Sequence, residues 1–397
     1  MATNSFRKSQ LIAFDNVAAG QYVAPCVMSP FKLIYTNSDG VLSDPSGALV
    51  VKPCKQSEID FYESTSSHPD FVPYIPTYMG KLSLGSDTHT AQVAGSLILS
   101  GDLTPEVPAQ ASPTNLTVEK AWAPSNGGKI QTDLAVILEN IAAGYRKPNI
   151  LDVKLGKRLW ADDAPAEKRA RLDKAAEETT SQVLGFRIAG MKTFQGEDMP
   201  HKVDLTPDGY KLFDKNYGRT FNVHTIQQGF EEYFLVTQGT KPASGIRKVI
   251  KRFLEDLKGI ATAIENEESR MYSASLLFVY EGDRLALDHA FSKEVEVLKT
   301  LNDNRRSTEG VRDNGATNTI GNEKGNASDD EDEAPTFPAI QSLKLIDFAH
   351  AQWTPGQGPD SNLLHGIRNV SKILADLVNR REGSTLSSEV PQNLAPS

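Results

Sequence analysis

The chain has little cysteine, no long apolar run and no excess of basic residues, and each shortage excludes a class of protein. Only Cys26 and Cys54 occur in 397 residues, so neither a disulfide framework nor a cysteine-based zinc site is indicated. No apolar run approaches the roughly 20 residues needed to span a bilayer, and the N-terminus lacks the layout of a secretory signal. A net charge of −9 argues against direct nucleic-acid binding, which needs a broad basic surface. We therefore expect an intracellular protein without a membrane span.

Three motifs that hold or transfer phosphate in other proteins are also missing. The chain contains neither a G-x-G-x-x-G nor a G-x-x-x-x-G-K-[ST] loop, and it has no His-Arg-Asp catalytic loop. An ordinary protein kinase is therefore disfavoured. A composition of 39% hydrophobic and 23% charged residues is typical of a folded globular protein, and the length suffices for one two-lobed domain or two ordinary domains.

The segment from Pro148 to Gly156 is the most informative feature present. If a strand begins after the proline, Asp152 and Lys154 lie two residues apart and therefore on one face. A carboxylate beside an ammonium group suits phosphoryl transfer to a hydroxyl, because the carboxylate orients or deprotonates the alcohol while the ammonium group holds phosphate charge. An ordinary edge strand carrying a solvated ion pair is the alternative.

The spacing P-x-x-x-D-x-K-x-G of this segment resembles the hallmark of the inositol polyphosphate kinase family. Two later segments agree in order and type: Tyr272 to Gly282 resembles the S-S-L-L strand of the family, and Leu345 to His350 resembles its I-D-F-A-H strand. The short segment after Gly156 and the long polar insert before Ile346 are most similar to the multikinase branch, in a fungal-like form.

The resemblance implies an α+β, two-lobed, kinase-like fold with a small β-rich N-lobe and a larger C-lobe. We place the nucleotide-binding N-lobe at 1–140 and the C-lobe at 141–397, with inositol-phosphate-binding helices at about 160–185. Within the C-lobe, the polar, Asn-, Asp- and Gly-rich segment at about 301–337 is expected to be a disordered acidic insert.

On the nucleotide side, Lys52 ends an expected strand and Glu58 lies in the helix that follows. In a kinase-like lobe such a lysine reaches the donor phosphates and the glutamate holds it by an ion pair; a solvated surface lysine is the alternative. Lys55 is the alternative to Lys52 for contacting the donor phosphates, but its place in the turn after Pro53 directs its side chain less well toward them. The backbone of Glu139 and Ile141 resembles the connector that pairs with the edge of adenine, although a strand end without a ligand fits as well.

Asp347 lies on an apolar strand. Burying a carboxylate in such surroundings costs free energy unless the group is paired or bound to a metal. Mg²⁺ prefers oxygen ligands and is the natural partner between protein and triphosphate, while a salt-bridged aspartate is the alternative. By the resemblance, Ser275 supplies a hydroxyl near that metal. The sequence departs from the family pattern at Ala274, which stands in place of the first serine of the motif.

On the acceptor side, Lys168, Arg171 and Lys174 recur every three residues on an expected helix over 164–182. They fall on one face and, with Lys154, would form a cationic wall suited to a ligand with several phosphates. Interleaved acidic residues leave a solvated helix with internal ion pairs as an alternative. The resemblance suggests that His350 touches a substrate phosphate, whereas a buried, structurally satisfied histidine fits nearly as well.

The resemblance thus implies transfer of the γ-phosphate of ATP, with Mg²⁺, to soluble inositol phosphates such as inositol 1,4,5-trisphosphate at the 6- and 3-hydroxyls. A trisphosphate 3-kinase, a hexakisphosphate kinase and a non-catalytic transcriptional scaffold remain alternatives. The acidic run 328–333 is a solvating linker or a docking segment for transcription-factor partners. We expect the protein in the nucleus and cytoplasm.

Overall fold

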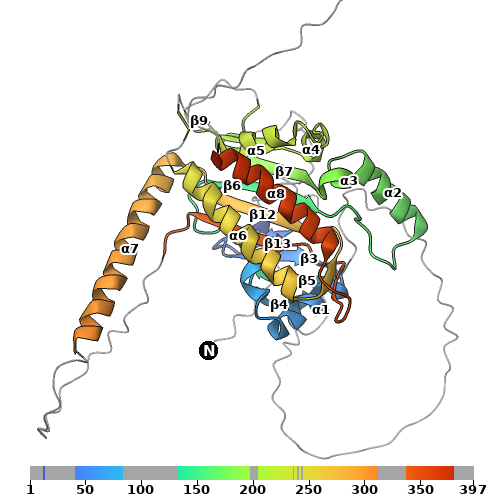
Figure 1. Cartoon of the computed structure of the whole chain (residues 1–397), viewed down its shortest axis with the longest axis horizontal. Coiled ribbons are helices and arrows are strands. Elements are labelled where there is room, and N and C mark those ends of the chain that lie inside the picture. Colours follow the sequence, from blue (N-terminus) through green and yellow to red (C-terminus); the bar gives the residue numbers. More distant parts are fainter. Residues whose placement is uncertain are drawn as a thin grey trace, which may run out of the picture.

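Two five-stranded antiparallel sheets form the framework of the chain (Figure 1). The computed structural model describes residues 12–13, 41–83, 132–196, 204–235, 237–238, 241–242, 245–311 and 337–379. No helix within these ranges is long and apolar enough to cross a membrane. Strands and helices are mixed along the chain, as the expected α+β fold requires.

The first sheet, which we call the N-terminal sheet, has the strand order β1-β2-β3-β5-β4. Its strands are β1 (Ile12–Ala13), β2 (Leu42–Ser43), β3 (Leu49–Pro53), β4 (Tyr78–Ser83) and β5 (Leu134–Glu139). The helix expected after Lys52 is α1, and two short 3₁₀ turns follow it; their bounds are α1 (Gln56–Ser64), η2 (Thr65–Ser67) and η3 (Val72–Tyr74).

The second sheet, the C-terminal sheet, has the order β13-β12-β6-β7-β8. Its strands are β6 (Pro148–Leu155), β7 (Phe186–Phe194), β8 (Tyr210–Phe213), β12 (Ser275–Glu281) and β13 (Gln341–Ile346). The strand that carries Asp152 and Lys154 is the central one, so the edge-strand alternative is excluded.

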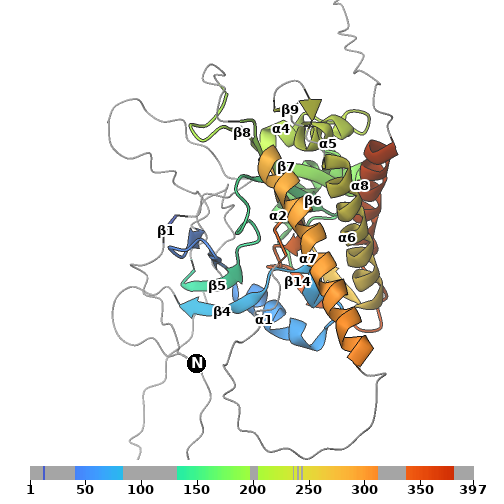
Figure 2. The same cartoon turned by 90° about the vertical axis from the view of Figure 1, so that its left-hand side faces the viewer.

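One face of the C-terminal sheet is covered by two long helices, α6 (Ile246–Asn266) and α8 (Ser361–Asn379). Their apolar residues recur at three-to-four spacing, which places them on one side of each helix. In Figure 2 these helices lie along one side of the molecule, and β4 and β5 of the N-terminal sheet lie toward the other. The sheet therefore has one covered face and one face turned to the N-terminal part.

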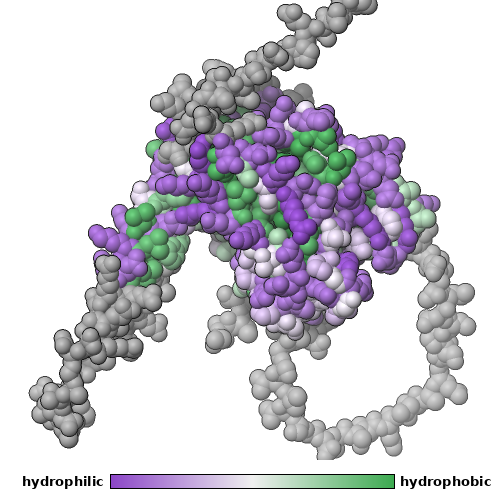
Figure 3. Space-filling model, in the orientation of Figure 1, coloured by the Kyte–Doolittle hydropathy of each residue, from purple (hydrophilic) through white to green (hydrophobic). Residues whose placement is uncertain are grey.

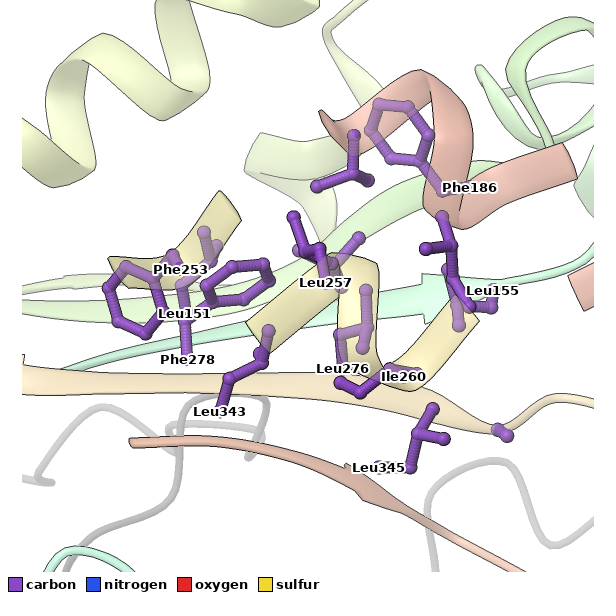
Figure 4. Packing of buried hydrophobic residues seen from close by; sticks show 14 of the residues in the cluster. Leu151, Leu155, Phe186, Phe253, Leu257, Ile260, Leu276, Phe278, Leu343 and Leu345 are labelled. Atoms are coloured by element: carbon purple, nitrogen blue, oxygen red, sulfur yellow. The ribbon is translucent and has the colours of Figure 1, made fainter. Parts of the chain in front are cut away.

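Alternation along β6 assigns its residues to these two faces. Leu151, Val153 and Leu155 are fully buried in the core cluster that includes residues of α6 and α8. Figure 4 shows Leu151 and Leu155 among side chains of this cluster, and side chains two residues apart share a face. Asp152 and Lys154, between them, must therefore point to the opposite face. The hydrophobic core thus fixes the direction of both predicted catalytic side chains.

The remaining elements surround this framework. They are α2 (Ala166–Glu177), α3 (Ser181–Leu184), α4 (Lys215–Arg219), α5 (Ile226–Phe234), α7 (Arg284–Val311), and the strand pairs β9 (Thr237–Gln238) with β10 (Lys241–Pro242) and β11 (Ser269–Met271) with β14 (Ala351–Trp353).

The expectation that disorder begins at about residue 301 is wrong, because α7 continues to Val311. Its first turns are anchored by the buried Leu287 and Ala290; once a helix is nucleated, each further residue adds a hydrogen bond at little cost. Beyond them the helix extends from the body of the molecule (Figure 1). Its exposed residues include the apolar Val295 and Leu298, and Figure 3 shows hydrophobic surface along this helix. Residues 312–336, including the acidic run 328–333, lie outside the described residues.

The continuous helix expected over 164–182 is instead two helices, α2 and α3. Two threonines lie at the break. The Thr179 hydroxyl donates to the carbonyl of Ala175, and the Thr180 hydroxyl donates to the carbonyl of Phe186 on β7. Such side-chain bonds compete with the helical backbone pattern, so the chain turns here and enters the sheet.

Phe278→Ala tests the core beneath the site. Phe278 on β12 is fully buried and packs its ring against Phe253 of α6, with centroids 5.0 Å apart. Truncation should lower the free energy of unfolding by about 3–5 kcal/mol, because a cavity replaces the ring. Denaturant unfolding measures this, and Leu285→Ala is the control because Leu285 is 76% exposed. Equal loss in both variants would contradict this description of the core.

Candidate active site

A carboxylate held by two lysines lies on the open face of the C-terminal sheet. Asp347, directly after β13, accepts a hydrogen bond from Lys52 Nζ of β3 at 2.7 Å and one from Lys154 Nζ of β6 at 3.3 Å. Lys52 also donates to Glu58 Oε1 of α1 at 2.8 Å. Four residues that the sequence singled out therefore form one network across the two sheets.

Within this network, neighbouring charges favour the ionised forms of Asp347 and Lys52. Burial alone would raise the pKa of Asp347, but Lys52 and Lys154 outweigh it and hold that pKa well below its usual range. Burial would likewise lower the pKa of Lys52, and the carboxylates of Asp347 and Glu58 instead raise it. The side chain of Asp347 keeps 35% of its surface exposed, so a ligand can reach it.

Two non-glycine residues with positive φ shape the backbone around the network. Asp347 has φ 70° and Ser273 has φ 60°. Residues other than glycine rarely adopt positive φ, and those that do cluster at active sites and ligand-binding turns. The carbonyl of Ser273 accepts a hydrogen bond from Lys154 Nζ at 2.8 Å, and its hydroxyl donates to the carbonyl of Leu159. The turn before β12 thus helps to aim Lys154.

Asp152 lies beside this network with an unsatisfied oxygen. It is 8% exposed, and burial raises its pKa, opposed by Lys154 and aided by the Asp347 carboxylate. The Ser275 hydroxyl lies close enough to lower that pKa somewhat, yet neither Asp152 Oδ1 nor Ser275 Oγ has a hydrogen-bond partner among the described residues. Unpaired buried oxygens require an explanation, and a catalytic role or a bound ion explains a pair of them beside this network.

Register explains why Ser275 is there. Ser275 of β12 pairs with Lys154 of β6 on one side and with Ile346 of β13 on the other. Directly paired residues point to the same face of a sheet, so Ser275 shares the open face with Lys154 and lies next to Asp347. Ala274, which replaces the first serine of the motif, is fully buried within the core.

Aromatic side chains fix α1 against the chain that follows Asp347. The ring of Phe61 stacks on Phe348 at 4.7 Å and on Trp353 at 4.9 Å between centroids. Trp353 Nε1 donates to the hydroxyl of Ser64 at 2.8 Å. Because α1 carries Glu58 and Phe348 follows Asp347, this packing sets the distance between the two carboxylates that hold Lys52.

Comparison with known proteins identifies the family to which this arrangement belongs. The family model described as inositol polyphosphate kinase matches residues 135–375. The inositol polyphosphate multikinase of Saccharomyces cerevisiae is 31% identical over 84% of this chain and 94% of its own length. The chain belongs to the inositol polyphosphate kinase family.

Two further relatives agree with this assignment. The inositol polyphosphate multikinase of Schizosaccharomyces pombe is 27% identical over 85% of this chain and 93% of its own length. A crystal structure of inositol phosphate multikinase from S. cerevisiae, in complex with ADP and Mn²⁺, has a TM-score of 0.53 and 27% identity, covering 84% of this chain and all of that one. The resemblance read from the motifs, its fungal multikinase branch and the α+β kinase-like fold are thereby confirmed.

Within this inositol polyphosphate kinase, the expected cationic wall of α2 is only partly assembled at the site. Lys168 Nζ lies 3.0 Å from His350 Nε2, and Arg171 acts on Lys168 electrostatically. Lys174 is exposed and pairs with Glu178 at 3.6 Å, so no described contact links it to the network. The ligand role expected for Lys174 lacks support here, whereas Lys168 and His350 lie together.

The connector residues lie at the other end of the open face. Glu139 ends β5 and Ile141 begins the turn to β6. Ile141 packs with a small apolar cluster that is separate from the main core and includes Ile150 and Val279. An apolar surface beside a strand end suits a flat base, but no observation tests the predicted backbone pairing, which stays a prediction.

One charged residue of the site was not anticipated from the sequence. Arg187 on β7 pairs in register with Lys154, so both share the open face. Burial, and next the nearby Arg219, lower its pKa to about 10, while Asp152 opposes the shift; the guanidinium stays charged at neutral pH. In the sequence, the one indication of a role for Arg187 is that it is a single arginine in an apolar segment. Its pairing with Lys154 can be seen only in the structure.

Lys168→Met tests the pairing at the acceptor side. Burial, Lys168 and Lys55 together lower the pKa of His350 to about 4, since neighbouring cations disfavour imidazolium. Removing the Lys168 charge should raise that pKa by about one unit, measured by NMR titration of the imidazole. Lys174→Met is the matched control and should leave His350 unchanged. An unaltered titration in Lys168→Met would show that the two side chains are not neighbours.

Proposed function

We propose that this protein is a multikinase that transfers the γ-phosphate of ATP to ring hydroxyls of soluble inositol phosphates. The observation that carries the proposal is the convergence of Asp152 and Asp347, 195 residues apart in the sequence, around Lys154 on the face opposite the core. The family match and the two fungal multikinase relatives support the substrate class.

Asp152 is the group best placed to receive the proton of the acceptor hydroxyl. Its raised pKa makes it a stronger base than an exposed aspartate, and its Oδ1 is free of partners among the described residues. As the hydroxyl oxygen bonds to the γ-phosphorus, the bond to the bridging oxygen of ADP breaks and the hydroxyl proton passes to Asp152. Lys154 balances the negative charge on the transferred group, and Lys52, held by Glu58, steadies the donor phosphates.

The donor set fits Mg²⁺ as the divalent ion. Asp347 offers an ionised carboxylate and Ser275 an unpartnered hydroxyl, and Mg²⁺ is typically held by one or two carboxylates together with substrate phosphates and water. When bound, the ion would neutralise charge on the triphosphate. The ADP and Mn²⁺ bound in the S. cerevisiae structure support nucleotide and divalent metal at such a site.

On the acceptor side, Lys168, Arg187 and His350 are the proposed phosphate ligands, with Arg171 at their margin. We propose inositol 1,4,5-trisphosphate as a substrate, phosphorylated at the 6- and 3-positions. Fewer than thirty residues separate Gly156 from Gly185, and so short a segment supports a site that accepts several substrates. A trisphosphate 3-kinase or a hexakisphosphate kinase would share these groups but give other products.

Two proposals concern the protein outside its catalytic site. We propose that the acidic run 328–333 docks transcription-factor partners and that the protein works in the nucleus and cytoplasm. The clustered negative charge in the sequence supports a docking segment. Deleting 328–333 should then abolish capture of such partners while leaving kinase activity intact.

Incubation of the protein with ATP and Mg²⁺ across a panel of defined inositol phosphates tests the function. We expect inositol 1,4,5-trisphosphate to gain phosphates at the 6- and 3-positions, as resolved by separating product isomers. Product at the 3-position alone would identify a trisphosphate 3-kinase, and pyrophosphate products from the hexakisphosphate would identify a hexakisphosphate kinase. No phosphorylation of any member would remove the proposal and favour a scaffold.

Asp152→Asn tests the mechanism. The amide cannot accept the proton, so kcat should fall by about 10²–10⁴-fold, with the KM for ATP and the thermal midpoint nearly unchanged. Asp173→Asn is the control, because Asp173 lies on α2 and accepts a hydrogen bond from Trp160 Nε1 rather than from a residue of the network. Wild-type turnover in Asp152→Asn would rule out this residue as the base.

A further inference from the structure

The backbone amide of Ile141 lacks a partner in a stretch where its neighbours are paired. Before it, the amide of Asn140 donates to the carbonyl of Ala48 at 2.8 Å. After it, the amide of Ala142 donates to Asn140 Oδ1 at 3.0 Å, and the amide of Ala143 donates to the Asn140 carbonyl at 2.9 Å. Within the ranges that the structure describes, no oxygen accepts a hydrogen bond from the Ile141 amide. Its neighbours therefore leave one donor open, and this is the donor expected to meet adenine.

Asn140 clamps the start of the connector, residues 140–147, to the N-terminal sheet. Its side chain is buried, with 8% of its surface exposed. Nδ2 donates to the carbonyl of Gly47, in the turn before β3, at 2.7 Å, while Oδ1 accepts from the amide of Ala142. Both ends of the side-chain amide are thus used on the backbone around Ile141.

Peptide planarity turns these bonds into a direction for the open amide. The carbonyl of Asn140 and the N–H of Ile141 belong to one trans peptide unit, in which the two groups point in opposite directions. The carbonyl is held by the amide of Ala143, so the N–H of Ile141 is directed away from the turn. Rotation of this peptide would break that bond, and the bond from Ala142 to Asn140 Oδ1 resists the same rotation.

Glu281, the last residue of β12, clamps the other end of the connector to the C-terminal sheet. It is 3% exposed, and its carboxylate accepts from the backbone amides of Arg146 at 2.6 Å, Lys147 at 2.9 Å and Asp283 at 2.9 Å. The amide of Gly282 donates to the Lys147 carbonyl at 2.8 Å. A Cβ atom on Gly282 would lie 2.6 Å from that carbonyl oxygen, so glycine permits this close approach of the two backbones.

Apolar side chains fix the connector between the two clamps. Ile141, Ala142 and Tyr145 pack with Ile150 of β6 and Val279 of β12. These strands are neighbours in the C-terminal sheet, and β6 also carries Asp152 and Lys154. The connector is therefore held by both sheets and by a small apolar cluster, which fixes its backbone geometry without a nucleotide.

We propose that Asn140 and Glu281 are positioning residues that hold the Ile141 amide toward the nucleotide base and thereby make the site prefer ATP to GTP. The proposal rests on the proposed function, because it concerns the donor nucleotide of the same site. Adenine presents a ring nitrogen that accepts a hydrogen bond, whereas guanine presents an N–H at the same position. A fixed donor pairs with the first base and leaves polar groups unpaired against the second, which is how a hydrogen-bonding site rejects an analogue.

Asn140→Ala tests the first clamp, because it removes both side-chain bonds and lets the peptide turn. The dissociation constants for ATP and GTP, each with Mg²⁺ and without acceptor, are measured by calorimetry. Binding of ATP should weaken about three- to tenfold, as for one net hydrogen bond, and binding of GTP should change less, so the preference for ATP falls. The KM for inositol 1,4,5-trisphosphate should stay unchanged. Asn140→Asp keeps an acceptor for the Ala142 amide and should recover most of the preference.

Glu281→Gln tests the second clamp independently. An amide nitrogen replaces one carboxylate oxygen and cannot accept from a backbone N–H, so the preference for ATP should fall here as well. This variant decides the question if Asn140→Ala does not fold. Asn222→Ala is the matched control: Asn222 Oδ1 accepts from the backbone amides of His224 at 2.8 Å and Thr225 at 3.2 Å, in the turn before α5. Both dissociation constants should stay unchanged in the control.

The outcomes separate this inference from the proposed function. A wild type that binds ATP and GTP equally well would overturn the inference. So would clamp variants that lose thermal stability while keeping the wild-type preference, because Asn140 and Glu281 would then serve folding alone. In either case, phosphorylation of inositol phosphates by the wild type would leave the proposed function standing. If the clamp variants lose the preference and the wild type phosphorylates none of the inositol phosphates, the inference stands and the proposed function falls.

Discussion

The site depends on the sharing of one carboxylate, Asp347, between two lysines that come from different sheets. Lys52 reaches it from the N-terminal sheet and Lys154 from the C-terminal sheet. Their positive charges keep Asp347 ionised in spite of burial, and a carboxylate oxygen is a typical ligand of Mg²⁺. Asp347 and Lys154 in turn lie close enough to Asp152 to shift its pKa, so the groups proposed for the donor and for the acceptor meet around Asp347 and Lys154.

Packing, more than the ion pairs themselves, determines this geometry. Ion pairs with partial exposure contribute little stability on their own, whereas the elements that carry them are anchored by buried apolar side chains. The stack of Phe61 on Phe348 and Trp353 holds α1 against the loop after β13, and the alternation along β6 turns Asp152 and Lys154 away from the core. The charged residues are therefore free to interact with ligands because other residues provide the stability.

The sequence identified the parts that are local in the chain. Asp152 and Lys154 share a face by simple alternation, and the amphipathic spacing of 246–264 predicted α6. It failed where a competing local interaction or a distant partner decides the result: Thr179 and Thr180 interrupt the expected helix, and the anchored start of α7 carries the helix into a polar segment. Arg187 was missed because nothing in its own segment indicates that it pairs with Lys154.

The sequence by itself determined the chemistry available to this protein: which carboxylates and ammonium groups exist, which lie on apolar strands, and which family shares their spacing. Only the tertiary structure decided which of them meet. It brought Lys52 to Asp347 and Lys168 to His350, while it left Lys174 paired with Glu178 on the outside of α2. The physical reason is that periodicity fixes the direction of a side chain within its own element, whereas the docking of one element against another is set by the packing of the whole core.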